Sequence, residues 1–241
     1  MSRSMMVNEL ATLLKATPVD ADVRDLSRFI VRDNLLGKPT LSSREKTLRH
    51  LRRAYGLDPE KTLWRVLRKF AQQEPQQIPL LGLSLVYARD TQLQLSFQLV
   101  NSLRLGQELP RALMEELFES SRPGAFTAGM KVSLAQNLNT TWTASGHLAG
   151  SARKVRTRPR THWLATTYAM FVGYLSGIRG QALLDSDYAR LVGVDPLTAA
   201  DHLATAAAHG LIRFRNAGGV VETDFRNLLL PIEMELLHVQ D

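Results

Sequence analysis

The sequence contains no cysteine and none of the compact motifs that mark common enzyme active sites. Without cysteine it can form no disulfide and can offer no thiolate to a metal or a substrate. It also lacks a GxGxxG loop, a Walker-type phosphate loop, an HExxH motif and a GxSxG elbow, and its six histidines show no ligand-like spacing with carboxylates. We therefore expect a protein that is not an enzyme and uses no cofactor, metal or small-molecule substrate.

Signals for export and for membrane insertion are missing as well. The first residues reach Glu9 before an apolar run can form, so we expect a cytoplasmic protein. Residues 162–178 lack formal charge, and Gly173 and Gly177 have GxxxG spacing, but these seventeen residues fall short of the about 20 that a membrane span needs. Small residues also permit close packing in a soluble core, so we expect no membrane partner.

Acidic residues are absent from residues 120–184, which carry eight lysines and arginines. Residues 1–119 carry 18 basic and 14 acidic residues, and residues 185–241 carry four and nine, which gives the formal net charge of +7. A stretch of 65 residues without a carboxylate creates a positive field that favours an anionic partner. Alternatively, acids are missing there because much of the stretch is buried helix.

Leucine-rich stretches with helical spacing dominate the chain and predict a mainly α fold. Ser42 with Glu45 predicts a capping box, and Asp58-Pro59 predicts the start of the next helix. The run Ser120–Gly124 (SSRPG) is the best candidate boundary between domains. We expect a helical bundle domain over residues 1–122 and a C-terminal domain over residues 123–241.

Residues 180–226 carry the pattern of a winged helix. A helix near 181–192, a turn at Gly193, a helix opened by Pro196 with Leu197 facing inward, and a hairpin over residues 211–225 follow one another in the winged-helix order. Arg213 and Arg215 could touch a nucleic-acid backbone, but the second helix offers no lysine or arginine to a groove. The module is therefore open to a DNA-binding, a protein-binding or a structural role.

The basic segment, residues 151–160 (SARKVRTRPR), holds the densest positive charge. Its five cations have no compensating acid, and the arginine fork matches phosphate oxygens, so we expect them to bind DNA; they are Arg153, Lys154, Arg156, Arg158 and Arg160. Proline disfavours helix at the preceding residue, which predicts an extended segment. The alternative is a flexible basic linker that touches nothing.

Further candidate cations lie outside this segment. Two predicted helices at 44–55 and 60–71, with the turn between them, hold nine basic and three acidic residues. An ordinary solvated helix face explains them equally well. From these helices and the rest of the chain we add to the candidate DNA-binding set Arg49, Arg52, Arg53, Arg65, Lys131, Arg213 and Arg215.

Several segments resemble the BrxA family of BREX bacteriophage-defence systems. They are Leu41–Pro59 (LSSREKTLRHLRRAYGLDP), Leu63–Leu67 (LWRVL), Leu85–Asp90 (LVYARD), Lys131–Asn139 (KVSLAQNLN), Ser145–Gly150 (SGHLAG) and the basic segment. The family is described as similar to the RNA-binding antitermination protein NusB and is regarded as DNA-binding. The resemblance thus implies a NusB-like helical module without catalytic residues, which works with other BREX proteins, a methyltransferase and an ATPase among them.

Composition and resemblance together favour binding of double-stranded DNA, mainly through phosphate contacts. A protein-interaction adaptor within the defence complex is the first alternative. RNA binding, which rests on analogy with NusB alone, is the second.

Overall fold

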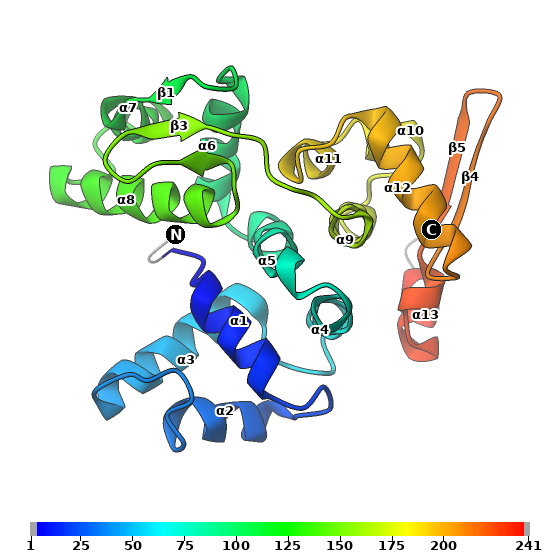
Figure 1. Ribbon diagram of the computed structural model, residues 1–241, viewed down its shortest axis with the longest axis horizontal. Helices are drawn as coiled ribbons and strands as arrows, with labels where there is room; N and C mark the ends of the chain where they lie inside the picture. The colour runs from blue at the N-terminus through cyan, green and yellow to red at the C-terminus, as the bar shows by residue number, and fades with distance from the viewer. Residues whose placement is uncertain (1–3, 239–241) are drawn as a thin grey trace.

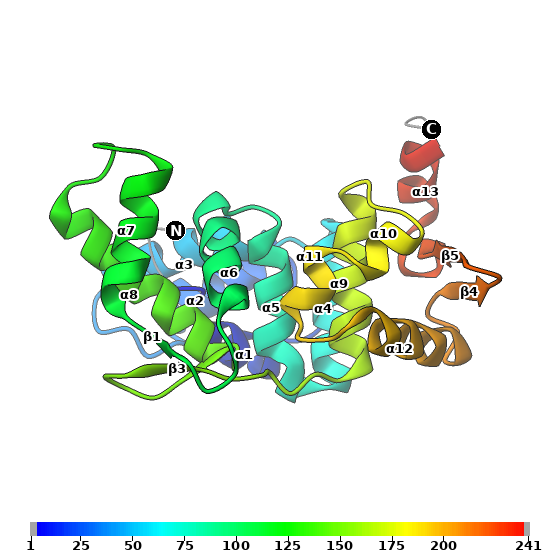
Figure 2. The same ribbon diagram turned by 90° about the horizontal axis from the view of Figure 1, so that it is seen from above.

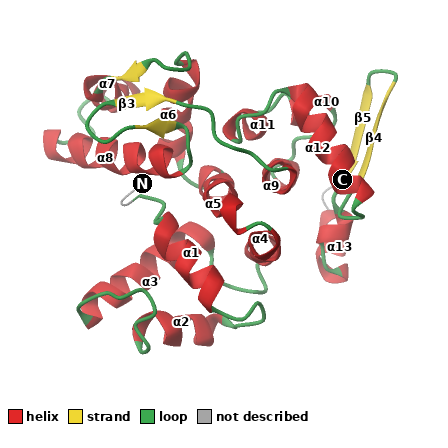
Figure 3. Cartoon of the chain, in the orientation of Figure 1, coloured by secondary structure: helices red, strands yellow, loops and turns green. Residues whose placement is uncertain are grey.

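The computed structural model describes residues 4–238 and is mainly helical, with two small antiparallel sheets. Figure 1 shows three groups of elements arranged around the central helix α5, and Figure 3 shows how little of the chain is strand. The predicted mainly α class is confirmed.

The first group is a bundle of helices from the N-terminal third of the chain. These are α1 (Val7–Ala16), α2 (Val23–Val31), α3 (Leu41–Tyr55), α4 (Thr62–Gln73) and α5 (Ile78–Tyr87), with a 3-10 turn at Pro75–Gln77 before α5. Helices α1, α3 and α4 all pack against α5, while α2 packs on α3. Nine of the ten residues of α5 are buried, which explains why its sequence is apolar on all sides.

Two predicted helix starts in this bundle are wrong. Helix α3 is capped by Thr40, two residues before Ser42, and the capping box joins Thr40 to Ser43 rather than Ser42 to Glu45. Asp58 caps a turn by accepting the Glu60 backbone N–H at 3.0 Å, and α4 starts only at Thr62. Local hydrogen bonding of an Asp in a turn competes with helix capping, and here the turn is formed.

The second group contains helices α6 (Thr91–Ser102), α7 (Arg111–Ser121) and α8 (Ala128–Ala144) and a three-stranded sheet. Its strands are β1 (Glu108–Leu109), β2 (Leu148–Ala149) and β3 (Lys154–Arg156), with β3 in the centre. Trp142 of α8 is fully buried, and its indole N–H donates to Ser96 Oγ at 3.0 Å. This tryptophan is a core residue and offers no exposed aromatic face.

The third group is organised by α9 (Trp163–Leu175). It contains α10 (Gln181–Leu184), α11 (Asp187–Leu191), α12 (Pro196–Ala208), β4 (Arg213–Ala217), β5 (Val220–Asp224), a 3-10 turn at Arg226–Leu228 and α13 (Pro231–His238). The helix expected near 181–192 is thus two short helices. The order of two helices, turn, helix and hairpin agrees with the sequence-based expectation, but Leu197 is 75% exposed and does not face inward.

Helix α9 joins the third group to the bundle. All its residues from Leu164 to Gly173 are buried, and it packs on α4, α5, α11 and α12. A Cβ atom on Gly173 would lie 2.9 Å from the Tyr188 ring, so the small residue permits close packing with α11. Within residues 4–238, no helix combines the length and apolar character of a membrane span.

The segment Ser120–Gly124 connects helices that pack on each other. Helices α7 and α8 are in contact, and the Phe118 and Phe126 rings meet edge to face with centroids 5.9 Å apart. Thr141 Oγ1 of α8 also accepts the Met5 backbone N–H at 3.1 Å. Side chains from both sides of the segment belong to one buried cluster. The division into two domains at residue 122 stays a prediction.

Candidate nucleic-acid interface

Part of the basic segment, Lys154–Arg156, forms the central strand of a sheet. Val155 of β3 pairs with Glu108 of β1 on one side and with Ala149 of β2 on the other. The Arg156 backbone continues the pairing, since its N–H donates to Gln107 O at 2.8 Å and its carbonyl accepts the Gly106 N–H at 2.9 Å. The predicted extended conformation is therefore present, and the flexible-linker alternative is wrong.

The turn from β2 into β3 depends on Gly150. Its φ is +94°, and a Cβ atom there would lie 2.1 Å from the Arg153 backbone oxygen. Its own carbonyl accepts a hydrogen bond from Lys154 Nζ at 2.6 Å. Only glycine fits this position without moving the backbone that carries Arg153 and Lys154.

We expect Gly150→Ala to destabilise the protein by about 1–3 kcal/mol, because the added methyl group overlaps backbone and the conformation is strained. Chemical denaturation measures the change. Gly218→Ala is a matched control, since Gly218 also has positive φ, at +59°, but a Cβ atom added there would meet nothing within 4 Å. Equal losses in the two variants would show that positive φ alone, and not the clash with Arg153, sets the cost.

Beyond β3, a buried proline fixes the segment that leads to α9. Pro159 lies against Gly146 and against Gly193, where a Cβ atom would come within 2.8 Å of the proline ring. Because successive side chains of an extended chain point to opposite sides, burial of Pro159 turns its neighbours Arg158 and Arg160 outward. Both are exposed, and among residues 4–238 no acidic partner is found for either. Figure 1 shows this segment running from the sheet to α9.

The other three cations of the basic segment have protein partners. Arg153 donates to Glu108 at 2.6 Å, which raises its pKa, yet its side chain stays 79% exposed. Lys154 bonds Gly150 O as described above. Arg156 is only 7% exposed, and its Nη1 donates to the backbone oxygens of His147 and Thr157. The structure therefore presents Arg153, Lys154, Arg158 and Arg160 to solvent and withdraws Arg156.

Most candidate cations of α3 and α4 are dispersed or engaged. Arg52 donates to Ser27 Oγ at 2.6 Å, and Arg65 forms an ion pair with Glu233 of α13 at 2.5 Å. Arg49 and Arg53 are exposed on α3. In Figure 1, α8 separates α3 from the basic segment. These cations do not extend the surface of the basic segment.

Two arginines of α3 and α4 donate hydrogen bonds to backbone oxygens of the protein itself. Arg68 is 3% exposed and donates to the backbone oxygens of Thr17, Pro18 and Ala21, at the end of α1. Arg44 donates to Val31 O at 3.3 Å and to Lys38 O at 3.2 Å. A guanidinium has five donors, so one side chain can satisfy several carbonyls left free at helix ends.

Lys131 and the two hairpin arginines lie beside acids. Lys131 of α8 pairs with Glu119 of α7 at 2.9 Å. Arg213 and Arg215 are exposed, but in the β4–β5 register they lie opposite Asp224 and Glu222. Cross-strand partners share one face of a hairpin, so this face carries balanced charge. The hairpin adds no net positive charge to the interface.

Helix α12 presents an acidic and apolar surface. Leu197 and Asp201 are exposed, and no lysine or arginine occurs between Pro196 and Ala208. His202 contacts Thr166 Oγ1 at 2.8 Å, and His209 stacks on Trp163 with ring centroids 4.8 Å apart. His202 and His209 thus both contact α9.

The turn before β1 contributes a cation that was not among the predicted site residues. Arg104 is exposed in the turn whose Gly106 bonds to Arg156 O, so it lies beside the basic segment. No local pattern marks it, because pairing of β1 with β3 joins residues almost fifty positions apart. Figure 2 shows the sheet, the connecting segment and α12 along one side of the molecule.

The histidines and carboxylates are dispersed over the fold. Within residues 4–238, no three His, Asp or Glu side chains gather in a group that could hold a metal ion. His147 is buried and bonded on both ring nitrogens, to Ser145 Oγ and to Leu191 O, each at 2.9 Å.

Comparison with known proteins adds no further assignment: no family model matches the chain, and no curated protein matches it. The resemblance to the BrxA family rests on the segments quoted above.

Proposed function

We propose that this protein binds double-stranded DNA without modifying it, mainly through phosphate contacts from the basic segment. The observation that carries the proposal is the pair Arg158 and Arg160, exposed on either side of the anchored Pro159 and without an acidic partner among the described residues. Arg153 and Lys154 extend this cationic edge toward the sheet.

The geometry of the edge suits a regular polyanion. An extended chain advances about 3.3 Å per residue, so alternate side chains are about 6.6 Å apart and the run from 153 to 160 spans about 23 Å. Phosphates on one strand of duplex DNA advance about 3.4 Å per step along the axis. Of the four exposed cations, Lys154, Arg158 and Arg160 lie on one side of an extended chain, about 13 Å and about 6.6 Å apart, which matches phosphates four and two steps apart on one strand.

Pre-organisation supports affinity at this edge. The sheet pairing and Pro159 hold the backbone before any ligand arrives, which lowers the entropy cost of binding. No carboxylate occurs in residues 120–184, and Glu108, from the neighbouring strand, is the acid that a phosphate must displace from Arg153.

We propose weak sequence preference. Residues 180–226 have the element order of a winged helix, but α12 carries no cation and the hairpin charges are balanced. A helix that reads the major groove usually brings arginine, lysine or amide groups to base edges. We assign this module to protein contact instead, with the exposed Leu197 and Asp201 as its surface.

The biological setting is proposed from the resemblance to the BrxA family. On that basis the protein is a non-catalytic, cytoplasmic component of a BREX defence system, with a helical bundle like that of NusB. DNA binding through the basic segment and protein contact through α12 would together place partner proteins on the duplex.

A salt titration tests the proposal. With about four phosphate contacts, log K for duplex DNA should fall with log salt with a slope of about −3 to −4, because each contact contributes about 0.9. Electrophoretic shifts with duplex DNA, single strands and structured RNA measure it. Preference for structured RNA would favour the NusB-like alternative. The adaptor alternative would be favoured if duplex DNA is not shifted. In that case a pull-down from cells should still recover defence proteins after nuclease treatment.

A further inference from the structure

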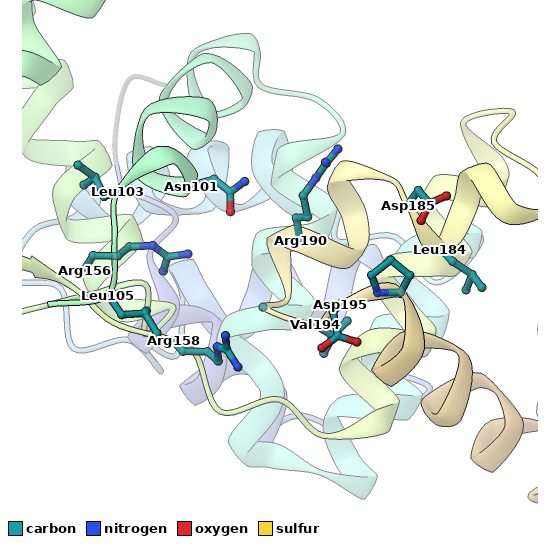
Figure 4. Close-up of a pocket in the computed structure, with 12 residues that line it drawn as sticks. Asn101, Leu103, Leu105, Arg156, Arg158, Leu184, Asp185, Arg190, Val194 and Asp195 are labelled. Atoms are coloured by element: carbon teal, nitrogen blue, oxygen red, sulfur yellow. The ribbon is translucent and has the colours of Figure 1, made fainter. Parts of the chain in front are cut away.

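A cleft separates the basic segment from the turn between α11 and α12. It has a volume of about 430 Å³, within the range of small-ligand pockets. One wall carries Arg156 and Arg158, and the other carries Val194 and Asp195, with Leu105 at the edge. Figure 4 shows both arginines extending from the same chain segment toward the opposite wall.

Arg156 is the unusual group in this cleft. It is 7% exposed, its Nε is buried without a hydrogen-bond partner among the described residues, and its bonded Nη1 contacts only backbone oxygens. Burial lowers the pKa of Arg156, and the nearby charge of Arg158 lowers it further. A buried cation beside a second cation is costly unless an anion joins them.

The carboxylates that line the cleft are already engaged. Asp195 caps α12 by accepting the Thr198 backbone N–H at 2.8 Å, and this bond lowers its pKa. Asp185 accepts from Gln181 Nε2 at 3.1 Å. The third arginine, Arg190, pairs with Asp187 at 2.8 Å. Among the described residues, Arg156 and Arg158 form no ion pair with an acid, although Asp185 and Asp195 line the same cleft.

We propose that Arg156 and Arg158 form a binding site for the phosphate group of a small phosphomonoester, such as a nucleoside monophosphate. Two guanidinium groups can donate several charge-assisted hydrogen bonds to one tetrahedral dianion. The apolar side chains Leu103 and Leu105, on the side of the arginines, and Val194, on the opposite side, contact the organic part of the ligand. This site overlaps the DNA interface proposed above at Arg158 and otherwise uses different residues.

Sharing of Arg158 has a regulatory consequence. A ligand that occupies Arg158 removes one cation from the DNA-binding edge, so the phosphomonoester and DNA compete. By linkage, DNA lowers the affinity for the ligand by the same factor. The cleft thus makes DNA binding sensitive to a phosphorylated metabolite.

Calorimetric titration of the full chain with inorganic phosphate, AMP and adenosine tests the site. AMP should bind more tightly than inorganic phosphate, and adenosine should not bind measurably. Arg158→Gln, an exposed substitution that leaves the fold intact, should weaken AMP binding about tenfold or more, because glutamine cannot replace the charge-assisted hydrogen bonds of the guanidinium. Arg156→Lys, which keeps the charge but removes Nε, should weaken it as well.

Arg160→Gln is the matched control, since Arg160 is exposed two residues away and does not line the cleft. It should reduce DNA affinity and leave AMP binding unchanged. The proposal is overturned if AMP does not bind, if adenosine binds equally well, or if Arg160→Gln weakens AMP as much as Arg158→Gln. A dinucleotide without terminal phosphates that binds as tightly as AMP would also overturn it, by identifying the nucleic-acid backbone as the ligand. Failure of AMP binding with intact DNA binding leaves the function proposed above standing.

Discussion

Replacing Arg153, Arg158 and Arg160 together by glutamine is expected to weaken duplex DNA binding about 100-fold or more at low salt and to flatten the log K against log salt slope by about 2–3. Each residue contributes an exposed guanidinium to one edge, and a phosphate that no longer meets a guanidinium keeps its counterion. The expected change in slope is given as a range because Arg153 already pairs with Glu108 and must exchange this partner for phosphate. Fluorescence anisotropy at several salt concentrations gives both quantities.

A second triple variant provides the matched control. Arg49, Lys61 and Lys69 are exposed on or beside α3 and α4, and their change to glutamine removes the same charge from another part of the molecule. We expect this variant to keep most of the slope. A normal slope in the first variant with a flattened slope in the second would move the interface to α3 and α4 and refute the role of the basic segment.

The sequence predicts those features that depend on neighbouring residues. Leucine-rich stretches with helical spacing predict the mainly α class, and a turn rich in glycine between two β-prone runs predicts the β4–β5 hairpin. Pro159 disfavours helix at Arg158, and the structure has no helix there, with the strand Lys154–Arg156 just before it. Each of these signals is local, so a single sequence is enough to read it.

Whether an individual arginine is buried or exposed depends on contacts with residues distant in sequence. Arg156 and Arg158 have the same type and the same alternation, yet Arg156 is buried and Arg158 is exposed. Pairing of β3 with β1 and packing of Pro159 on Gly193 decide the difference, and both join segments distant in sequence. Likewise, the Arg65 ion pair with Glu233 spans 168 positions. Charge counting therefore predicts a basic protein but not which cations face a ligand.

His147 also shows how burial decides chemistry. The sequence marks it only as a histidine near a glycine, whereas the fold seals it between Trp142 and Leu191. Because Leu191 O can only accept, Nε2 carries the ring proton and Nδ1 accepts from the Ser145 hydroxyl. The neutral ring is thus satisfied, and a second proton would place a buried charge close to Arg156, whose Nη1 bonds to His147 O.

We therefore expect stability to fall as the pH drops below about 6.5. Burial, with the nearby Arg156 charge, lowers the pKa of His147 to about 3, so between these values the unfolded chain binds a proton that the folded protein does not. The free energy of unfolding should decrease by about 1.4 kcal/mol per pH unit in this window, or about 2–3 kcal/mol between pH 6.5 and 4.5. Carboxylates with lowered pKa, such as Asp195 and Asp224, act mainly at lower pH, near their unfolded values.

His147→Gln should remove this dependence, because glutamine can bond to Leu191 O but does not titrate. Urea denaturation of both proteins at pH 7.5 and 4.5 measures the effect: the variant is less stable at pH 7.5 but its free energy of unfolding falls by about 2–3 kcal/mol less on acidification. An unchanged fall in the variant would show that other groups, and not the sealed imidazole, control the acid response. Since His147 O holds Arg156, the same acidification should also loosen the strand that carries the basic segment.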